Sequence, residues 1–199
     1  MPLPVRVLTL DAALDGSSAG LVVDGVVAAV RSGPGGRGQA AALPCLARDV
    51  LAGTPAVLLH HIAVTVGPGS FTGIRAALAL AHGIGLAAGV PVVGVTVGAV
   101  LDKTPGQMFW TAVHGRSGHV LLEMGGAVQL VALDALPRPA GPVLVGGNAA
   151  AEVAARLGPI AVVVPGGPEP SGIAAAAVRH PRPAEPLYVE PPRTTRPAP

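Results

Sequence analysis

Alternating apolar and polar stretches predict strands and helices in a regular order along the first hundred residues. Residues 5–10 (VRVLTL) are rich in Val and Leu and predict a buried strand that ends at Asp11. Two further apolar runs, 19–23 and 26–30, are joined by Asp24-Gly25, a dipeptide typical of hairpin turns. The pattern then predicts a helix at residues 39–52 and a strand within 56–66. A second helix at 74–88 and a second strand at 90–95 follow. Strand–helix crossovers of this kind imply parallel strands added to an antiparallel start.

The second half of the chain repeats this order. A hairpin is predicted around Gly115-Arg116-Ser117-Gly118, and two later helices open at Asn148 and Ser171, residue types that favour helix N-caps. Because a meander followed by alternating strands and helices occurs twice, we expect an α/β fold with two ribonuclease-H-like lobes. The predicted strands are 107–114, 119–124, 128–133, 143–147 and 160–164, and the predicted helices are 148–157 and 171–179. The expected domains are an N-terminal lobe, 1–98, a smaller C-terminal lobe, 99–180, and a Pro/Arg-rich tail, 181–199.

Composition narrows the possibilities. Of the 199 residues, 50% are hydrophobic and 12% are charged, which excludes a chain that is disordered throughout. The net charge of +2 does not by itself indicate a nucleic-acid surface. The single cysteine, Cys45, excludes a disulfide framework and a cysteine-rich zinc site, and its apolar neighbours predict an inert, buried thiol. No basic stretch precedes an apolar core at the start of the sequence, so we expect no signal peptide and a cytoplasmic location.

One apolar stretch, residues 76–101, is long enough to span a bilayer, with His82 as its one strongly polar residue. Gly89-Val90-Pro91 interrupts it with a helix stop, and a strand-like run follows. A buried helix, a turn and a buried strand fit this pattern better than a membrane helix does. A small membrane protein remains the less favoured alternative.

The segment between strand and helix, Gly67-Pro68-Gly69-Ser70-Phe71-Thr72-Gly73, is the most informative motif. Backbone N–H groups at the start of the following helix could face an anion. The motif is neither a Walker A loop nor the dinucleotide fingerprint, because both the spacing and a Gly-Lys-Ser/Thr run are missing. Pro68 stands where a nucleophile elbow needs glycine. The residues alone favour a structural tight turn, with phosphate binding as the alternative.

Other candidate residues carry weaker signals. Asp11 ends the first strand, where a carboxylate could serve a metal or phosphate site, although a capping or turn role is favoured. His60 and His61 would point to opposite faces of a strand, so they cannot chelate one metal ion. His114 and His119 could face each other across a hairpin, but no third ligand is evident. The sequence therefore predicts no metal site and no cofactor.

Residues 74–88 predict a helix without a polar face, and such a helix is buried on all sides. Either the second lobe covers this helix or a partner subunit does, because its small side chains let another helix approach closely. We expect the second arrangement. The predicted partner interface is Arg75, Leu78, Ala79, His82 and Leu86.

These motifs resemble a known family. Residues 62–73 (IAVTVGPGSFTG) and their continuation to residue 95 resemble the signature of the TsaB family, also called YeaZ. Residues 8–13, 102–110 and 184–188 resemble other segments of that family in the same order along the chain. The match is dense over 56–96 and patchy elsewhere.

The resemblance implies two lobes of the actin/hexokinase/Hsp70 (ASKHA) type, with the second lobe shortened. It also implies a non-catalytic subunit that pairs with TsaD, the catalytic subunit, through the helix after the glycine-rich turn. TsaE, an ATPase, works in the same complex, and TsaC supplies threonylcarbamoyl-adenylate. The product is threonylcarbamoyladenosine (t6A) at position 37 of tRNAs that read ANN codons. We therefore expect a heterodimer with TsaD, indirect contact with tRNA and no membrane. For the chain alone, a homodimer is the alternative assembly.

The sequence also departs from the family pattern. Ala12 stands where threonine is usual, which removes a hydroxyl near a would-be phosphate. Too few residues lie between Val95 and Asp102 for the helix usual in the family. The alternative function is that of an ATP-dependent phosphotransferase or a glycoprotease-like hydrolase of the same superfamily. Against it, Asp11-Ala12-Ala13 lacks the glycine and hydroxyl groups of a phosphate loop, and the sequence has no histidine pair at helical spacing.

Overall fold

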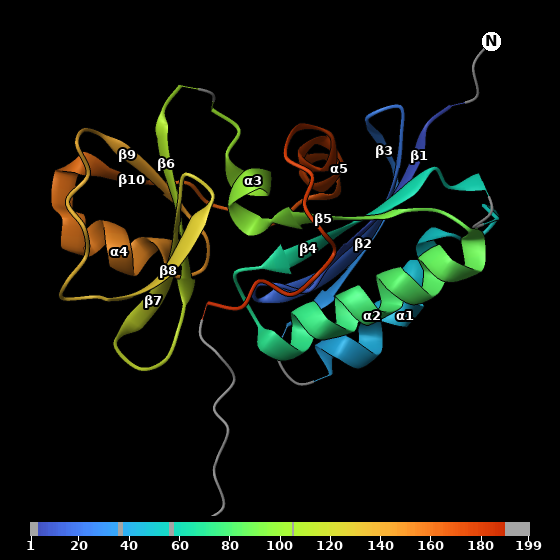
Figure 1. The fold of residues 1–199 in the computed structure, drawn as a ribbon, viewed down its shortest axis with the longest axis horizontal. Helices are drawn as coiled ribbons and strands as arrows, with labels where there is room; N and C mark the ends of the chain where they lie inside the picture. Colours follow the sequence, from blue (N-terminus) through green and yellow to red (C-terminus); the bar gives the residue numbers. More distant parts are fainter. Residues whose placement is uncertain (1–3, 36–37, 56–57, 105, 190–199) are drawn as a thin grey trace, which may run out of the picture.

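Two lobes, each built on a five-stranded mixed sheet, lie side by side in the computed structural model (Figure 1). The structure describes residues 4–35, 38–55, 58–104 and 106–189. In the first lobe the elements are β1 (Arg6–Asp11), β2 (Gly16–Val23), β3 (Val26–Pro34), α1 (Gln39–Val50), β4 (His61–Gly67), α2 (Phe71–Ala88) and β5 (Val92–Thr96). A short helix, α3 (Val97–Leu101), leads from this lobe to the next. It occupies the interval where the sequence has too few residues for the longer helix usual in the resembling family.

The first sheet has the strand order β3-β2-β1-β4-β5. Strands β1, β2 and β3 form an antiparallel meander, and β4 and β5 add to β1 in parallel, as the crossover pattern predicts. The meander's second turn, between β2 and β3, is the predicted hairpin: Asp24 and Gly25 have φ values of 50° and 81°, which suit a type I′ turn.

The second lobe repeats this topology. Its elements are β6 (Met108–His114), β7 (His119–Met124), β8 (Ala127–Ala132), β9 (Val143–Gly146), α4 (Ala150–Leu157) and β10 (Ala161–Val163). The strand order is β8-β7-β6-β9-β10, again with an antiparallel meander followed by two parallel strands. Residues 133–142 form an irregular connection at the position of α1 in the first lobe. The predicted fold class, two ribonuclease-H-like lobes with the second one smaller, is therefore confirmed.

Helices cover both faces of the first sheet. Leu8 and Leu10 of β1 point into a core closed by α1 and α2, whereas Val7 points into a second core on the other face. That second face is covered by α5 (Pro170–Arg179), whose Ile173 is fully buried. Although 99–180 is the expected second lobe by sequence, α5 thus packs on the first lobe (Figure 1).

The chain after α5 also stays on the first lobe. Gly94 and Arg182 exchange backbone hydrogen bonds of 2.9 Å, and the N–H of Leu187 donates to the carbonyl of Val66 at 2.9 Å. A Cβ on Gly94 would lie 2.4 Å from the carbonyl oxygen of Pro183, so glycine is needed for this close approach. The described part of the predicted tail, 181–189, is therefore packed on β5 and β4.

Three local predictions are wrong. Asn148 does not cap α4: the N-cap position is Ala149, and the Asn148 side chain bonds elsewhere. Ser171 lies inside the first turn of α5, whose N-cap is Glu169. Cys45 is exposed rather than buried, because α1 is amphipathic and turns Leu43 and Ala47 toward the sheet instead.

Helix α2 is, among the described helices, the one long and apolar enough to cross a membrane by length and composition, and 33% of its residues are buried. The helix packs along β4 and beside α1, and one helix that passes this test is weak evidence for a membrane span. Gly89 ends it with φ 68°, as the predicted helix stop requires.

Candidate functional site

The glycine-rich turn between β4 and α2 lies directly against the chain that follows β1. The N–H of Ser70 donates to the carbonyl of Ala13 at 2.7 Å. The Ser70 hydroxyl accepts from the N–H of Gly73 at 3.2 Å and so caps α2. Both polar groups of this serine are thus occupied by backbone.

Two glycines make this approach possible. A Cβ on Gly69 would lie 2.1 Å from the carbonyl oxygen of Ala13, and a Cβ on Gly73 would lie 2.0 Å from that of Ala12. Side chains at either position would force the two segments apart. This geometry favours the structural interpretation of the turn over phosphate binding.

Asp11 is buried beneath the same junction. Its Oδ1 accepts hydrogen bonds from the Thr65 hydroxyl at 2.5 Å and from the N–H of Ala13 at 3.2 Å. Burial nevertheless dominates, because removing a carboxylate from water disfavours its charged form, and it raises the pKa of Asp11 to about 6. Asp11 therefore serves chiefly as a buried acceptor that ties β1 to β4.

A cavity of ≈ 360 Å³ between the lobes adjoins this carboxylate. Its other polar lining includes Asp15 and Asn148, whose side chains hydrogen-bond across the lobes at 2.9 Å. The Ser17 hydroxyl, also in the lining, is buried without a partner. Among the residues that the structure describes, two carboxylates and no arginine, lysine or histidine line this cavity. The described lining therefore offers a phosphate group no cationic side chain.

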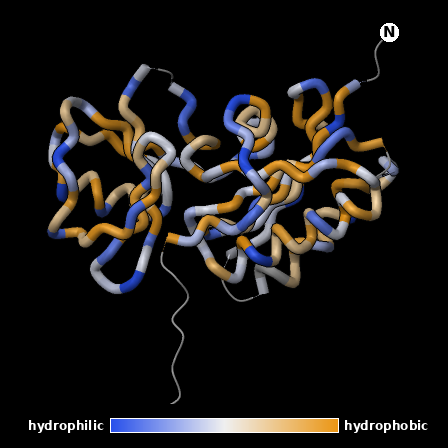
Figure 2. Tube along the Cα trace, in the orientation of Figure 1, coloured by the Kyte–Doolittle hydropathy of each residue, from blue (hydrophilic) through white to orange (hydrophobic). Residues whose placement is uncertain are grey.

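The outer face of α2 is exposed on the first lobe. Arg75, Ala79 and His82 are exposed, and Leu86 is 88% exposed, which is extreme for a leucine. Leu78 is different: its side chain is buried in the core among β-strand residues, because it lies on the helix face turned toward the sheet. The other four predicted interface residues share one exposed face, on which Ala79 and Leu86 are apolar and Arg75 and His82 are polar. Most of α2 is coloured as apolar in Figure 2.

The C-terminal segment fixes the beginning of this face. The Arg75 guanidinium donates to the Tyr188 hydroxyl through Nε at 3.0 Å and Nη2 at 2.8 Å. The same guanidinium lies 4.1 Å from the centre of the Phe71 ring. His82 Nε2 lies 2.8 Å from the carbonyl oxygen of Ala184. Residues 184–188 therefore form one structural unit with the motif turn and α2, from which they are far apart in sequence.

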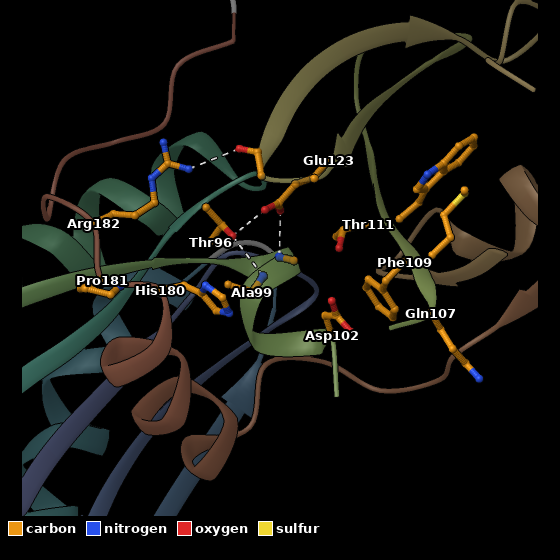
Figure 3. A pocket seen from close by; sticks show the side chains of 15 residues that line it. Thr96, Ala99, Asp102, Gln107, Phe109, Thr111, Glu123, His180, Pro181 and Arg182 are labelled. Atoms are coloured by element: carbon orange, nitrogen blue, oxygen red, sulfur yellow. Dashed lines mark hydrogen bonds between the residues drawn. The ribbon is translucent and has the colours of Figure 1, made fainter. Parts of the chain in front are cut away.

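A buried acid between the lobes was not singled out by sequence reasoning. Glu123 on β7 accepts from the Thr96 hydroxyl at 2.5 Å and from the N–H of Gly98 at 2.8 Å (Figure 3). Burial raises the pKa of Glu123. A Cβ on Gly98 would lie within 2.6 Å of all three carboxyl atoms, so only glycine admits the acid here. Thr96 also caps α3 by accepting from Ala99 at 3.0 Å.

These contacts fasten the second lobe to the helix that joins it to the first. The cavity beside them measures ≈ 650 Å³, and its wall includes Asp102, Phe109 and the buried, unpartnered hydroxyl of Thr111. Both oxygens of Glu123 are used in holding α3, so we interpret the acid as an interlobe joint. Gly98 is the one residue whose type hints in the sequence at this close packing. Its partner, Glu123, lies 25 residues away, so the sequence alone does not connect the two.

The histidines do not assemble a site. His114 pairs with Val120 in the β6–β7 ladder, so His119 is not directly opposite it and the predicted cross-strand pair is wrong. Among the residues that the structure describes, no group of three or more His, Cys, Asp or Glu could hold a metal ion.

The chain is similar in sequence to known proteins, and the matched segment includes the glycine-rich turn. The sequence profile of the family TsaD, tRNA N6-adenosine threonylcarbamoyltransferase, matches residues 50–122. An uncharacterized protein of Mycobacterium tuberculosis is 34% identical over 148 residues, which is 67% of this chain and 65% of that protein. The tRNA threonylcarbamoyladenosine biosynthesis protein TsaB of Escherichia coli is 30% identical over 125 residues, 53% of this chain and 54% of that protein. The chain thus spans less than two thirds of the length of either relative.

Solved structures agree with the lobed architecture. YeaZ from Pseudomonas aeruginosa superposes with a TM-score of 0.74 at 23% identity, covering 92% of this chain and 99% of that one. The resemblance to the TsaB (YeaZ) family is confirmed. The ethanolamine utilization protein EutJ from Carboxydothermus hydrogenoformans superposes with a TM-score of 0.50 at 14% identity, covering 87% and 90%. Both superpositions therefore support the predicted fold of two lobes.

Two substitutions test the structural role of the turn. Ser70→Ala removes the α2 cap and should lower the free energy of unfolding by about 1 kcal/mol. Gly73→Val should cost more, because its side chain meets the Ala12 carbonyl. Urea denaturation of both variants measures the difference. Equal stability of Gly73→Val and the parent chain would contradict the close approach.

Buried Asp11 predicts an unusual pH dependence. Its pKa is raised from 3.8 to about 6, so the folded state holds its proton more tightly and stability should fall as pH rises from 4 to 7. At about 1.4 kcal/mol per pKa unit, the ionised carboxylate costs about 3 kcal/mol. Asp11→Asn keeps an acceptor for Thr65 and Ala13, and should therefore be more stable than the parent at pH 8.

Thermal unfolding across that pH range tests this, with the exposed Asp134→Asn as the matched control. The advantage of Asp11→Asn should shrink toward pH 4, while the control should show no such trend. An Asp11→Asn variant that is less stable than the parent at pH 8 would instead assign the charge itself a stabilising role.

Proposed function

We propose that this chain is a TsaB-type, non-catalytic subunit that pairs with a TsaD-type catalytic subunit in forming t6A. In this proposal it acts in the cytoplasm, beside a TsaE-type ATPase, on position 37 of tRNAs that read ANN codons. The observation that carries it is the exposed face of α2. It follows directly on the family motif and leaves a leucine 88% exposed in the chain on its own.

The chemistry of that face fits a helix as the partner. Ala79 and Gly83 are exposed on α2, and small residues let a second helix approach closely. Burying apolar surface there contributes about 25 cal/mol per Å² before the cost of association is subtracted. The motif turn supports the face from beneath by fixing where α2 begins.

The test is a charge placed on this face. Ala79→Glu should fold with a near-normal melting temperature, because Ala79 is exposed. An unpaired carboxylate buried in the complex is costly, so the variant should fail to co-elute with the TsaD-type subunit and should abolish t6A formation. The matched control is Ala155→Glu, an exposed alanine on α4 of the second lobe.

Reconstitution uses the TsaD-, TsaE- and TsaC-type proteins of the same genome with a substrate tRNA. If Ala79→Glu does not fold, position 79 belongs to the core of the first lobe. If the variant folds and binds the TsaD-type subunit as the parent chain does, that subunit docks on another surface. Steady ATP turnover by the pure chain, well above background, would favour the phosphotransferase alternative instead.

A further inference from the structure

The larger cavity between the lobes has groups of both charge signs on its wall. It measures ≈ 650 Å³, a size typical of sites for small molecules, and it opens beside α3 and the first residues of β6. Asp102, directly after α3, supplies a carboxylate, and His180 and Arg182, in the segment after α5, supply basic groups. In Figure 3 the two basic side chains lie to the left of Asp102 and Thr111, so the acidic and basic groups are separated across the cavity.

The charged groups of this wall differ in how far their bonding capacity is used. Both oxygens of Glu123 already accept hydrogen bonds, from Thr96 and Gly98. Asp102 accepts one bond through Oδ1, from the N–H of Thr104 at 3.2 Å, which leaves its Oδ2 for a ligand. Arg182 donates through Nη1 to the carbonyl of Gly126 at 3.4 Å, and its other N–H groups point to no printed acceptor among the described residues.

Thr111 adds a buried hydroxyl without a partner to the same wall. The residue is 0% exposed and stands directly opposite Glu123 in the β6–β7 ladder. Its hydroxyl nevertheless makes no hydrogen bond to any residue that the structure describes. Buried hydroxyls in proteins normally have a partner, so a ligand group that bonds to this one would gain affinity from it.

We propose that this cavity binds a free α-amino acid, whose ammonium group contacts Asp102 and the Thr111 hydroxyl and whose carboxylate faces His180 and Arg182. An ammonium group has three N–H donors, which suit a carboxylate and a hydroxyl oxygen. A carboxylate in turn accepts strong hydrogen bonds from a guanidinium group. The inference goes beyond the pairing function proposed above and does not depend on it.

The apolar part of the wall accommodates the side chain of the amino acid. Ala99 of α3 and Phe109 of β6 line the cavity beside the polar groups. In Figure 3 the Phe109 ring lies next to Asp102, on the side of the cavity away from His180. An aliphatic or small side chain packed there would be removed from water.

Other classes of small ligand satisfy fewer of these groups. An anion that lacks a cationic group, such as a phosphate ester, would lie against the carboxylates of Asp102 and Glu123. A polyamine would meet the positive charge of Arg182, and an uncharged molecule would leave groups of both signs without an ionic partner. A ligand with one ammonium group and one carboxylate pairs with all of them.

The test is the binding of each standard amino acid to the whole chain. A ligand that binds the folded state raises the melting temperature, and titration calorimetry then gives the dissociation constant of the strongest one. Its carboxamide lacks the carboxylate, and its N-acetyl derivative lacks the ammonium group, so each should bind about tenfold more weakly or worse. These derivatives also imitate the two ends of a peptide. Binding of either one as tightly as the free amino acid would overturn the inference.

Thr111→Val separates contact with the ligand from a structural role. Valine has nearly the shape of threonine without its hydroxyl, so this variant should melt at or above the temperature of the parent chain. It should still bind the amino acid about tenfold more weakly, and so should Asp102→Asn, which keeps an acceptor for Thr104. Arg182→Gln should also weaken binding. Its matched control is Arg179→Gln, at an exposed arginine at the end of α5, which should bind as the parent does.

Two results would overturn the inference. One is that no standard amino acid binds the parent chain. The other is that Thr111→Val and Asp102→Asn, both folded, bind the amino acid as tightly as the parent does. Neither result bears on the pairing surface of α2, which the Ala79→Glu experiment tests separately.

Discussion

The contact of two backbones, at Gly69 and Gly73 on one side and Ala12 and Ala13 on the other, is the constraint on which the rest of this structure depends. A side chain at either glycine would meet a carbonyl oxygen at 2.0–2.1 Å. Because the turn packs directly against the backbone after β1, it fixes the position at which α2 begins over the first sheet. The buried Asp11 lies beneath the same junction and ties β1 to β4 through Thr65.

This backbone contact also determines which side of α2 is exposed. Helix α2 lays its buried side, including Leu78, on the sheet and presents the opposite side outward. A chain with so few aromatic residues places two of them, Phe71 and Tyr188, in the open beside that side. Both lobes and the C-terminal segment converge at this end of α2. The glycine-rich motif thus fixes the start of a helix whose outer side is exposed in this chain.

Much of the fold could be predicted from the sequence, because strand and helix patterns and turn residues are local signals. The doubled order of elements was visible in this way, and so was the hairpin at Asp24-Gly25. Long-range packing was not. That α5 returns to the first lobe depends on which sheet its buried Ile173 faces, which an apolar helix does not reveal. Glu123 on β7 accepts hydrogen bonds from Thr96 and Gly98, which lie on the other side of the lobe boundary. The sequence does not predict this contact, because a single glutamate in a strand of alternating pattern indicates only a solvent-facing position. Leu78 was misplaced for a related reason: a helix that is apolar all round gives no polar side from which to orient it.

Cross-linking tests the central claim, that α2 is the surface at which a TsaD-type subunit docks, most directly. A photoreactive residue can be placed at position 86, where the native leucine is 88% exposed, and at position 155 on α4 of the second lobe as a reference. Irradiation of each labelled chain with the TsaD-type subunit should give a covalent heterodimer from position 86 and none from position 155. A heterodimer formed from position 155 and not from position 86, under conditions where the complex forms, would contradict the account.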